Sequence, residues 1–327
     1  MITRRKLVFA LGAGALAPLT SIAQQPPAKI ARIGFLGSTS ASGFASHLEA
    51  LRTGLRESGY VEGKNIAIEF RWAEGKLDRL PELAAELVRL KVDVIVTHGT
   101  PGALAAKHAT STIPIVVATV GDPVGRGLIA SLARPGGNVT GLSNFSTELS
   151  AKRIELLKDA LPRIRNVAVL VNSDNFGSVG TFQAMEITAR SLKVRLHKFE
   201  VRGPKEFESA FSSMAKQRVD AVAMTNDALF ISNPKAIADL AAKQRLPAIG
   251  FPEFAEAGGL LGNGADLVAM FHRSANFIDR IFKGAKPSDL PVEQPMRFEM
   301  VINRKTANAL GLKISNTMLV QATKIIE

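Results

Sequence analysis

The sequence predicts an α/β protein with two Rossmann-like lobes, each built on a parallel sheet and joined by a three-crossing hinge. One observation is that residues 30–123 and 166–254 repeat the same order of apolar runs and helical segments. A second is that the runs are mostly apolar throughout, as in 92–97 and 219–225, which is typical of parallel strands buried on both faces. Because ligands of open parallel sheets bind beyond the carboxyl ends of the strands, two facing lobes predict a cleft between them.

Residues 1–23 have the pattern of a secretory signal peptide. Arg4, Arg5 and Lys6 precede an uncharged run over 7–19, and Ser21-Ile22-Ala23 fits the small-x-small pattern before a cleavage point. The basic residues also resemble a twin-arginine signal, so the general secretory and twin-arginine routes both stay open. No later stretch offers about 18 apolar residues in a row. We therefore expect a soluble protein exported to the periplasm.

The composition is that of a globular protein held by packing alone. The chain has 327 residues, of which 46% are hydrophobic and 21% charged, and it has no cysteine, so an exported form has no disulfides. The net charge is +12. Because Lys and Arg are scattered and not interleaved with aromatic residues, we expect a solvated basic surface and no nucleic-acid partner.

The first lobe is expected to contain two helices, a strand near a sheet edge and the first crossing strand. Apolar residues at helical spacing predict a helix over 43–57, ended by Gly59. Alternating apolar and polar residues predict a strand over 66–72 with one solvated face, near a sheet edge. A second helix is predicted over 81–90. The segment 138–143 follows a Pro-Gly-Gly turn and predicts the first crossing between the lobes.

The second lobe contains further helices, which we expect over 150–161, 204–216 and 234–244. The glycines around Leu260 and Leu261 indicate a second crossing, followed by a long amphipathic helix over 266–283. A third crossing strand is expected over 298–302, before a terminal helix running to Ile326. These elements assign the chain to lobe 1 (28–142 with 263–296) and lobe 2 (143–262 with 297–327).

Short motifs spread over the chain carry a family resemblance. They are Arg32–Leu36, Gly59–Gly63, Arg71–Gly75, Leu80–Ala84, Gly121–Val124, Arg134–Gly141, Glu253–Gly259 and Phe298–Asn303. In this order and spacing the chain resembles the ABC importer solute-binding proteins of the tryptophan/tyrosine-type substrate-binding family, which have the type I periplasmic binding protein fold. The resemblance implies a monomeric clamp that captures a small solute and delivers it to the importer's membrane permease. It implies no cofactor, no metal and no catalytic residue.

Polar residues at the predicted strand ends are the candidate ligand contacts. Hydroxyls and backbone N–H groups suit a carboxylate and an Asp suits an ammonium, so the set predicts an amino acid or a similar zwitterion. The same Ser and Thr residues also suit helix N-caps, and Asp122 suits a turn before Pro123. The candidates are Ser38, Thr39, Ser40, Thr97, His98, Thr100, Thr119, Asp122, Asn172, Asp174, Asn226, Asp227 and Phe251.

Two other classes of protein compete with this interpretation. An exported two-lobed enzyme would share the architecture, but the sequence has no nucleophile elbow, zinc-protease motif, phosphate loop or cysteine nucleophile. Paired carboxylates stay open, because the sequence does not give their separation. A ligand sensor acting on a membrane receptor would use the same clamp. We therefore expect a binding protein and not an enzyme.

Overall fold

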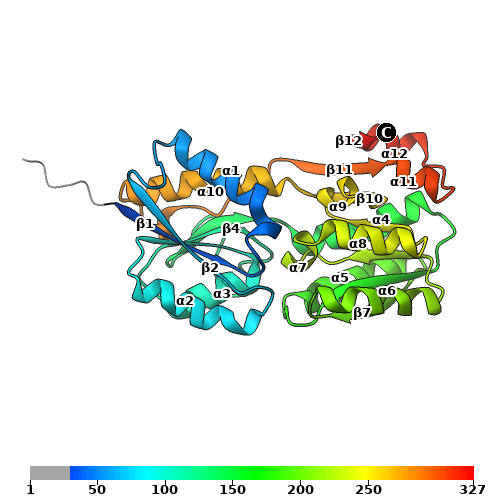
Figure 1. The fold of residues 1–327 in the computed structure, drawn as a ribbon, viewed down its shortest axis with the longest axis horizontal. Coiled ribbons are helices and arrows are strands. Elements are labelled where there is room, and N and C mark those ends of the chain that lie inside the picture. The colour runs from blue at the N-terminus through cyan, green and yellow to red at the C-terminus, as the bar shows by residue number, and fades with distance from the viewer. Residues whose placement is uncertain (1–29) are drawn as a thin grey trace, which may run out of the picture.

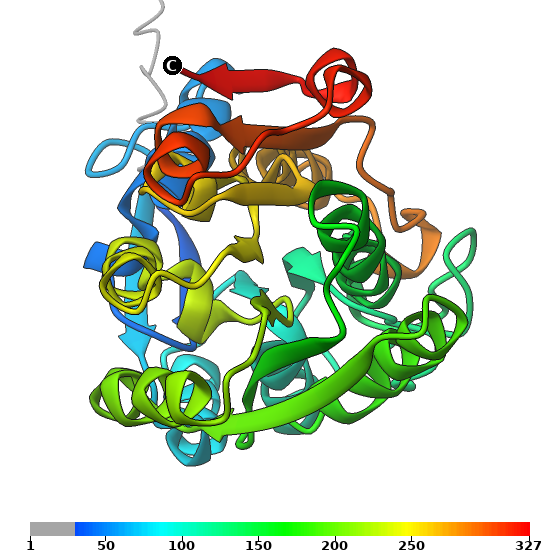
Figure 2. The same cartoon turned by 90° about the vertical axis from the view of Figure 1, so that its right-hand side faces the viewer.

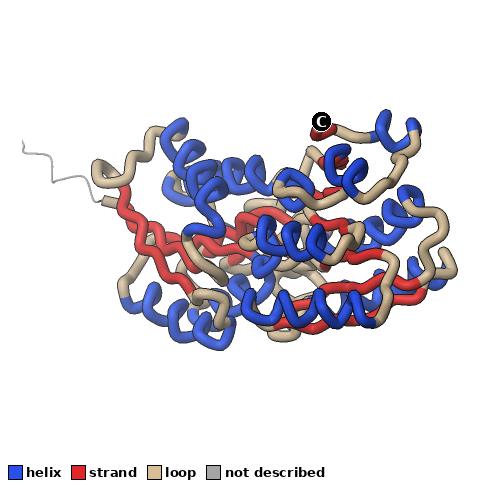
Figure 3. The backbone as a smooth tube through the Cα atoms, turned by 45° about the vertical axis from the view of Figure 1, so that its right-hand side comes forward, coloured by secondary structure: helices blue, strands red, loops and turns tan. Residues whose placement is uncertain are grey.

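The structure, a computed structural model, describes residues 30–327, so the expected signal peptide (1–23) lies outside the described residues. The chain forms two α/β lobes that lie side by side along the long axis of the molecule (Figure 1). One lobe holds a five-stranded sheet and the other a seven-stranded sheet, with helices on both faces (Figure 3). Over residues 30–327, no helix combines the length and the apolar character needed to cross a bilayer.

The sheet of lobe 1 is parallel throughout, in the order β2-β1-β3-β4-β5. Its strands are β1 (Ala31–Gly37), β2 (Ile66–Trp72), β3 (Val94–His98), β4 (Ile115–Val120) and β5 (Val139–Ser143). The inner strands β3 and β4 are buried over their full length, as helices on both faces require. β2 lies at the edge and is mostly half-buried, which confirms the edge position predicted from its alternating sequence.

Helices from distant parts of the chain cover this sheet. They are α1 (Ala45–Glu57), α2 (Leu80–Arg89), α3 (Gly99–Ala109) and α10 (Leu267–Phe282). α1 and α10 share one apolar core, in which Leu51 and Phe271 are buried. α2 and α3 pack on the opposite face. Because α10 returns to lobe 1 late in the sequence, this lobe is built from two separate segments.

The sheet of lobe 2 runs in the order β12-β11-β10-β9-β8-β6-β7. Its strands are β6 (Asn166–Asn172), β7 (Arg195–Val201), β8 (Ala221–Met224), β9 (Ala248–Gly250), β10 (Leu261–Ala265), β11 (Phe298–Asn303) and β12 (Lys324–Ile326). β10 and β11 are antiparallel and the other neighbours are parallel. In Figure 2 this order runs from the red C-terminal edge at the top to the green β7 at the bottom.

Lobe 2 also has a layer of helices on each face. These helices are α4 (Ser146–Ala160), α5 (Ser178–Ser191), α6 (Phe207–Lys216), α7 (Ala228–Ile231), α8 (Pro234–Lys243), α9 (Pro252–Glu256), α11 (Arg304–Ala309) and α12 (Asn316–Gln321). α4 and α5 pack on one face with Leu157 and Met185 in the core, and α6 and α8 pack on the other with Phe211 and Ile237 inward. Single turns of 3-10 helix complete the chain at 42–44, 77–79, 204–206 and 287–289.

Three crossings connect the lobes. β5 of lobe 1 leads into α4 of lobe 2, β10 of lobe 2 leads into α10 of lobe 1, and the segment after 289 returns to β11. The first and third crossings run side by side, because Ser143 N–H donates to Glu293 O at 2.9 Å and Glu293 N–H donates to Gly141 O at 2.9 Å. Short parallel connections of this kind form the hinge of a two-lobed clamp.

Two expectations from the sequence need correction or adjustment. The terminal helix to Ile326 is wrong, because α12 ends at Gln321 and Lys324–Ile326 form β12 beside β11. The outer edge of β11 has backbone groups that need partners, and the last residues of the chain supply them. β10 stays in the sheet of lobe 2 as far as Ala265, so the chain leaves this lobe at Asp266, slightly after the expected boundary.

Candidate functional site

Strand ends from both lobes meet around one cavity of about 60 Å³. On the lobe 1 side, its walls come from residues at or just beyond the carboxyl ends of β1, β3 and β4. On the lobe 2 side, they come from the loops after β6 and β8. This is the cleft that two facing parallel sheets predict.

The cavity brings together most of the candidates chosen from the sequence. Those that line it are Ser38, Thr39, His98, Thr100, Thr119, Asn172, Asn226 and Asp227. Those that do not line it are Ser40, Thr97, Asp122, Asp174 and Phe251.

Three of the candidates outside the cavity have structural partners. Ser40 Oγ accepts a hydrogen bond from Gly43 N–H at 3.4 Å, before α1 begins. Thr97 Oγ1 donates to Leu36 O at 2.9 Å inside the sheet. Phe251 is buried in the core of lobe 2. Thr97 and His98 are neighbours on one strand, so their side chains point to opposite faces, and only His98 reaches the cavity.

The two acidic candidates outside the cavity are exposed. Asp122 has a positive φ of 45°, and its Oδ1 accepts a hydrogen bond from Gly125 N–H at 2.9 Å. This is the turn that the sequence offered as the alternative role of Asp122. Asp174 lies 3.4 Å from Arg202 Nε at the outer rim of the cleft.

Several buried polar atoms in the cavity wall have no hydrogen-bond partner among the described residues. They are Ser38 Oγ, Thr39 Oγ1, His98 Nε2, Thr119 Oγ1 and Asn144 Oδ1. Each such atom costs about 1–3 kcal/mol when left unpaired. Polar atoms that converge on one cavity without partners therefore have free capacity to form hydrogen bonds with a polar ligand.

His98 presents a neutral imidazole to the cavity. Its ring centroid lies 4.2 Å from that of Phe44 and 5.9 Å from that of Phe271. Burial in this aromatic surrounding, with a smaller contribution from the charge of His47, lowers the pKa of His98 to about 3. At neutral pH the ring is uncharged, so its unpaired Nε2 can accept or donate a single hydrogen bond, according to its tautomer.

Asp227 presents a carboxylate from the opposite wall. Its oxygens accept hydrogen bonds from Asn172 Nδ2 at 3.0 Å, Asn175 Nδ2 at 2.6 Å and Leu229 N–H at 2.8 Å. Burial raises the pKa of Asp227, while the bonds from Asn175, Asn172 and Leu229 oppose this rise and the charge of Asp174 adds to it. No cationic side chain of residues 30–327 lies within 4.0 Å of the carboxylate. It is thus a buried carboxyl group that faces the cavity and is held in place by three hydrogen bonds.

The sequence did not point to every residue in the wall. Asn144 follows β5 in the first crossing, Ser146 begins α4, and both line the cavity. Their only sequence signal is that polar residues stand just after a predicted crossing strand. Asn175 also lines the cavity, and it is one of the polar residues that follow the predicted strand at 167–171. Aliphatic residues complete the wall, namely Leu77, Val120, Ala228, Leu229 and Ile231.

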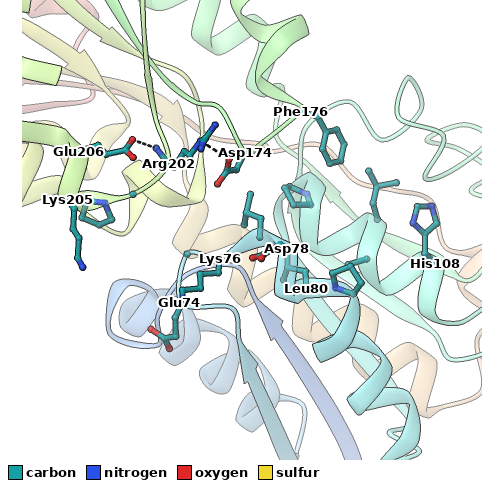
Figure 4. Close-up of a pocket in the computed structure, with 18 residues that line it drawn as sticks. Glu74, Lys76, Asp78, Leu80, His108, Asp174, Phe176, Arg202, Lys205 and Glu206 are labelled. Atoms are coloured by element: carbon teal, nitrogen blue, oxygen red, sulfur yellow. Dashed lines mark hydrogen bonds and ion pairs between the residues drawn. The ribbon is translucent and has the colours of Figure 1, made fainter. Parts of the chain in front are cut away.

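A larger groove of about 1100 Å³ opens beside the cavity (Figure 4). It runs between Glu74 and Asp78 of lobe 1 and Asp174, Arg202 and Glu206 of lobe 2, and it shares Gly75, Leu77 and Pro101 with the cavity. Its charged side chains are exposed. Arg202 Nε lies 3.4 Å from Asp174 Oδ1, and Glu206 Oε2 accepts a hydrogen bond from the backbone N–H of Arg202 at 2.8 Å. The groove is therefore the mouth of the cleft, and the smaller cavity behind it holds the unpaired polar atoms.

The lobes touch each other around the cavity. Arg126 Nη2 of lobe 1 donates to Gly177 O of lobe 2 at 3.2 Å, and His47 Nε2 lies 3.7 Å from Glu253 Oε1. A Cβ atom placed on Gly43 would lie only 2.4 Å from Ser232 Cβ in the other lobe. The cleft is closed in this structure.

Comparison with known proteins gives a consistent result. Residues 33–326 match the family model described as ABC transporter substrate binding protein. A curated relative from Clostridioides difficile (strain R20291), a tyrosine-binding protein, is 28% identical over 260 residues, covering 79% of this chain and 74% of that protein.

Two solved structures are similar along nearly their whole length. An ABC domain from Streptococcus pneumoniae in complex with L-Trp has a TM-score of 0.82 and 28% identity, with 90% of this chain and 99% of that chain covered. A conserved domain protein from Vibrio cholerae O1 biovar El Tor has a TM-score of 0.84 and 28% identity, with 91% and 100% covered.

Proposed function

Because the chain belongs to the family of ABC transporter substrate-binding proteins, we propose that its solute is an amino acid held in the cavity between the lobes. The family supplies the outline of the function. The chain has the type I periplasmic binding protein fold and binds a solute for an ABC transporter, whose membrane permease is its partner. The relatives named for tyrosine and solved with L-Trp support an amino acid as the class of solute.

One observation carries the proposal. Unpaired hydroxyls of Ser38, Thr39 and Thr119 line one wall of the cavity, and the carboxylate of Asp227 lines the other without a cation beside it. A ligand that satisfies both walls needs hydrogen-bond acceptors at one end and a cation at the other. An amino acid in its zwitterionic form has this arrangement.

The carboxylate of the amino acid is proposed to bind the lobe 1 wall. Gly99 and Thr100 form the first turn of α3, and both line the cavity. A helix N-terminus carries a partial positive charge and free N–H groups, and it favours anions. The unpaired hydroxyls of Ser38 and Thr39 lie in the same wall. Bonds from such donors to a carboxylate are short and directional.

The ammonium is proposed to bind Asp227. Three hydrogen bonds hold its carboxylate in place but leave acceptor capacity, since two carboxylate oxygens accept about four bonds. Asn144 Oδ1, a buried acceptor without a partner, lies in the same cavity. The side chain of the amino acid is proposed to meet Leu77, Leu229 and Ile231, so an apolar side chain is favoured.

The size of the cavity implies that the clamp must open to admit this ligand. A volume of about 60 Å³ is well below the roughly 300–1,000 Å³ of common ligand sites. We propose that the units that separate are lobe 1 (30–142 with 266–296) and lobe 2 (143–265 with 297–327), with the crossings near Asn144, Asp266 and Arg297 as the hinge.

Substrate-binding proteins of ABC transporters act outside the cytoplasm, and we propose that residues 1–23 direct this chain there. The mature protein should begin near Gln24 and bind its ligand as a monomer without altering it. N-terminal sequencing of periplasmic protein tests the leader, and a chain still beginning at Met1 would contradict it. Recovery of a chemically changed ligand would favour the enzyme alternative.

Calorimetric titration of the purified protein with each of the 20 common L-amino acids tests the ligand class. At least one amino acid should bind with one-to-one stoichiometry. It should also raise the melting temperature, because a ligand at one hundred times its Kd stabilises the native state by about 2.7 kcal/mol. Binding of none of them would refute the proposal while leaving the family assignment intact.

A further inference from the structure

An arginine lies in the interior of lobe 2, behind the wall of the cavity. Arg153 belongs to α4, and its side chain is 0% exposed. Its Nη1 donates to Met224 O at 2.7 Å. Its Nη2 donates to Asn226 Oδ1 at 2.8 Å and to Asn263 O at 2.9 Å. The guanidinium thus joins the end of β8, a residue of the cavity wall and the strand β10 that leads into the second crossing.

The partners of this buried cation are all neutral. No carboxylate within residues 30–327 comes as close as 4.0 Å to the guanidinium, and Glu253 acts on it only from farther away. A buried charge without an opposite charge is costly, and a well-packed apolar side chain would usually be more stable there. Stability of the core is therefore a poor reason for an arginine at this position.

Arg153 determines how the amide of Asn226 is oriented. A guanidinium only donates hydrogen bonds, so the atom of Asn226 that faces it must be the oxygen. The amide nitrogen then points away from Arg153. Asn226 lines the cavity, and within the described part of the chain its Nδ2 donates no hydrogen bond to the protein. Asn226 therefore presents an N–H donor to the ligand space from lobe 2.

We propose that Arg153 is a positioning residue that fixes Asn226 as a hydrogen-bond donor and so makes the lobe 2 wall selective for a ligand carboxylate. The charge of the guanidinium polarises the amide and strengthens its donor. This inference rests on the proposed amino-acid ligand and adds one contact, between Asn226 and the carboxylate of that ligand. The carboxylate would meet hydroxyls of lobe 1 and Asn226 of lobe 2 together, and would bridge the closed cleft.

The inference is tested by comparing acids with their neutral analogues. L-Tryptophan, L-tyrosine and L-leucine are titrated beside their primary amides, which keep the ammonium and side chain but lack the anion. For Arg153→Met, the affinity for the acid should fall by about tenfold to a hundredfold, the usual worth of a hydrogen bond to a charged group. The affinity for the amide should change little. The double variant Arg153→Met, Asn226→Ala should lose no more affinity for the acid than Asn226→Ala alone.

Two further variants separate this role from a general loss of stability. Leu157→Ala lies on the same helix and is equally buried; it should lower the melting temperature but keep the parent's ratio of acid to amide affinity. Asn226→Asp should fold well, since the new carboxylate pairs with Arg153. Its affinity for the amino acids should be lost, because the two carboxylates repel each other, whereas its affinity for the primary amides should stay near that of the parent. An unchanged acid-to-amide ratio in Arg153→Met or Asn226→Asp would overturn the inference.

Failure of the amino-acid proposal can be told apart from failure of this inference. If none of the 20 common amino acids binds the parent, the ligand class is wrong, and the side-chain amide resonances of Asn226 then decide the role of Arg153. They are assigned by their loss in Asn226→Ala. In the parent they should form one sharp pair, and in Arg153→Met they should shift and broaden as the amide becomes free to rotate. An unchanged pair would refute the positioning role.

Discussion

Asn175 Nδ2 donates a hydrogen bond of 2.6 Å to Oδ2 of Asp227. Asn172 Nδ2 donates to the other oxygen at 3.0 Å. One amide at the end of β6 and one in the loop after it therefore hold a carboxyl group that follows β8. Asp227 also caps α7 through Leu229 N–H. The carboxylate therefore has a fixed direction before any ligand arrives, which lowers the entropic cost of binding a cation.

Asp227→Asn removes the charge and keeps a residue that caps helices well. Affinity for the amino-acid ligand should fall by about 2–5 kcal/mol, because the ammonium is left buried without an opposite charge. Calorimetric titration measures this loss. Asp220→Asn is the control, since Asp220 Oδ2 accepts hydrogen bonds from the backbone N–H groups of Arg165 and Asn166 at 2.8 Å each and does not line the cavity. Equal affinities of the two variants would contradict the role of Asp227.

His98 should make the stability of the ligand-free protein depend on pH. Its folded pKa of about 3 lies below the ordinary histidine value of 6.5, so the unfolded chain binds the proton first as the pH falls. The stability is fully present above about pH 6.5 and is lost progressively toward about pH 3, with a slope of about 1.4 kcal/mol per pH unit. For His98→Gln, the free energy of unfolding measured in urea should fall less steeply as the pH falls, with a slope smaller by about this amount. Parallel curves for parent and variant would show that His98 does not stay neutral.

Locking the lobes together should block binding. The chain has no cysteine, and a Cβ on Gly43 would lie 2.4 Å from Ser232 Cβ, so a slight opening brings the pair to the roughly 3.8 Å of a disulfide. Gly43→Cys with Ser232→Cys should bind no amino acid when oxidised and should recover binding when reduced. The two single variants are the controls. Unimpaired binding by the oxidised form would mean that the ligand enters without separation of the lobes.

Gly141, in the hinge strand β5, should not tolerate a side chain. Its φ is +133°, and a Cβ there would lie 2.1 Å from Val117 O. Gly141→Ala should lower the free energy of unfolding by about 2–5 kcal/mol, from backbone strain and steric overlap together. Gly137→Ala, where a Cβ meets nothing within 4 Å, should leave stability nearly unchanged. Urea unfolding of both variants decides between these outcomes.

The sequence by itself determined the elements and their grouping into two lobes. Continuous apolar runs identified β3 and β8 as strands buried on both faces, and alternation placed β2 at the edge, because burial on one or two faces imposes a different residue pattern on a strand. Strand ends also predicted which polar residues would lie close together. His98, Asn172 and Asp227 line one cavity, because parallel strands bring their carboxyl ends to one edge of the sheet.

Only the tertiary structure decided which polar residues lie in the wall of the cavity or directly behind it. Asn144 comes from a crossing and Arg153 from the middle of a helix, where a charged residue usually faces solvent. Arg153 is buried only because carbonyls of β8 and β10, more than 70 residues away, converge on it. Hydrophobic pattern is a property of neighbours along the chain, whereas a binding site is made by groups that packing brings together from distant segments.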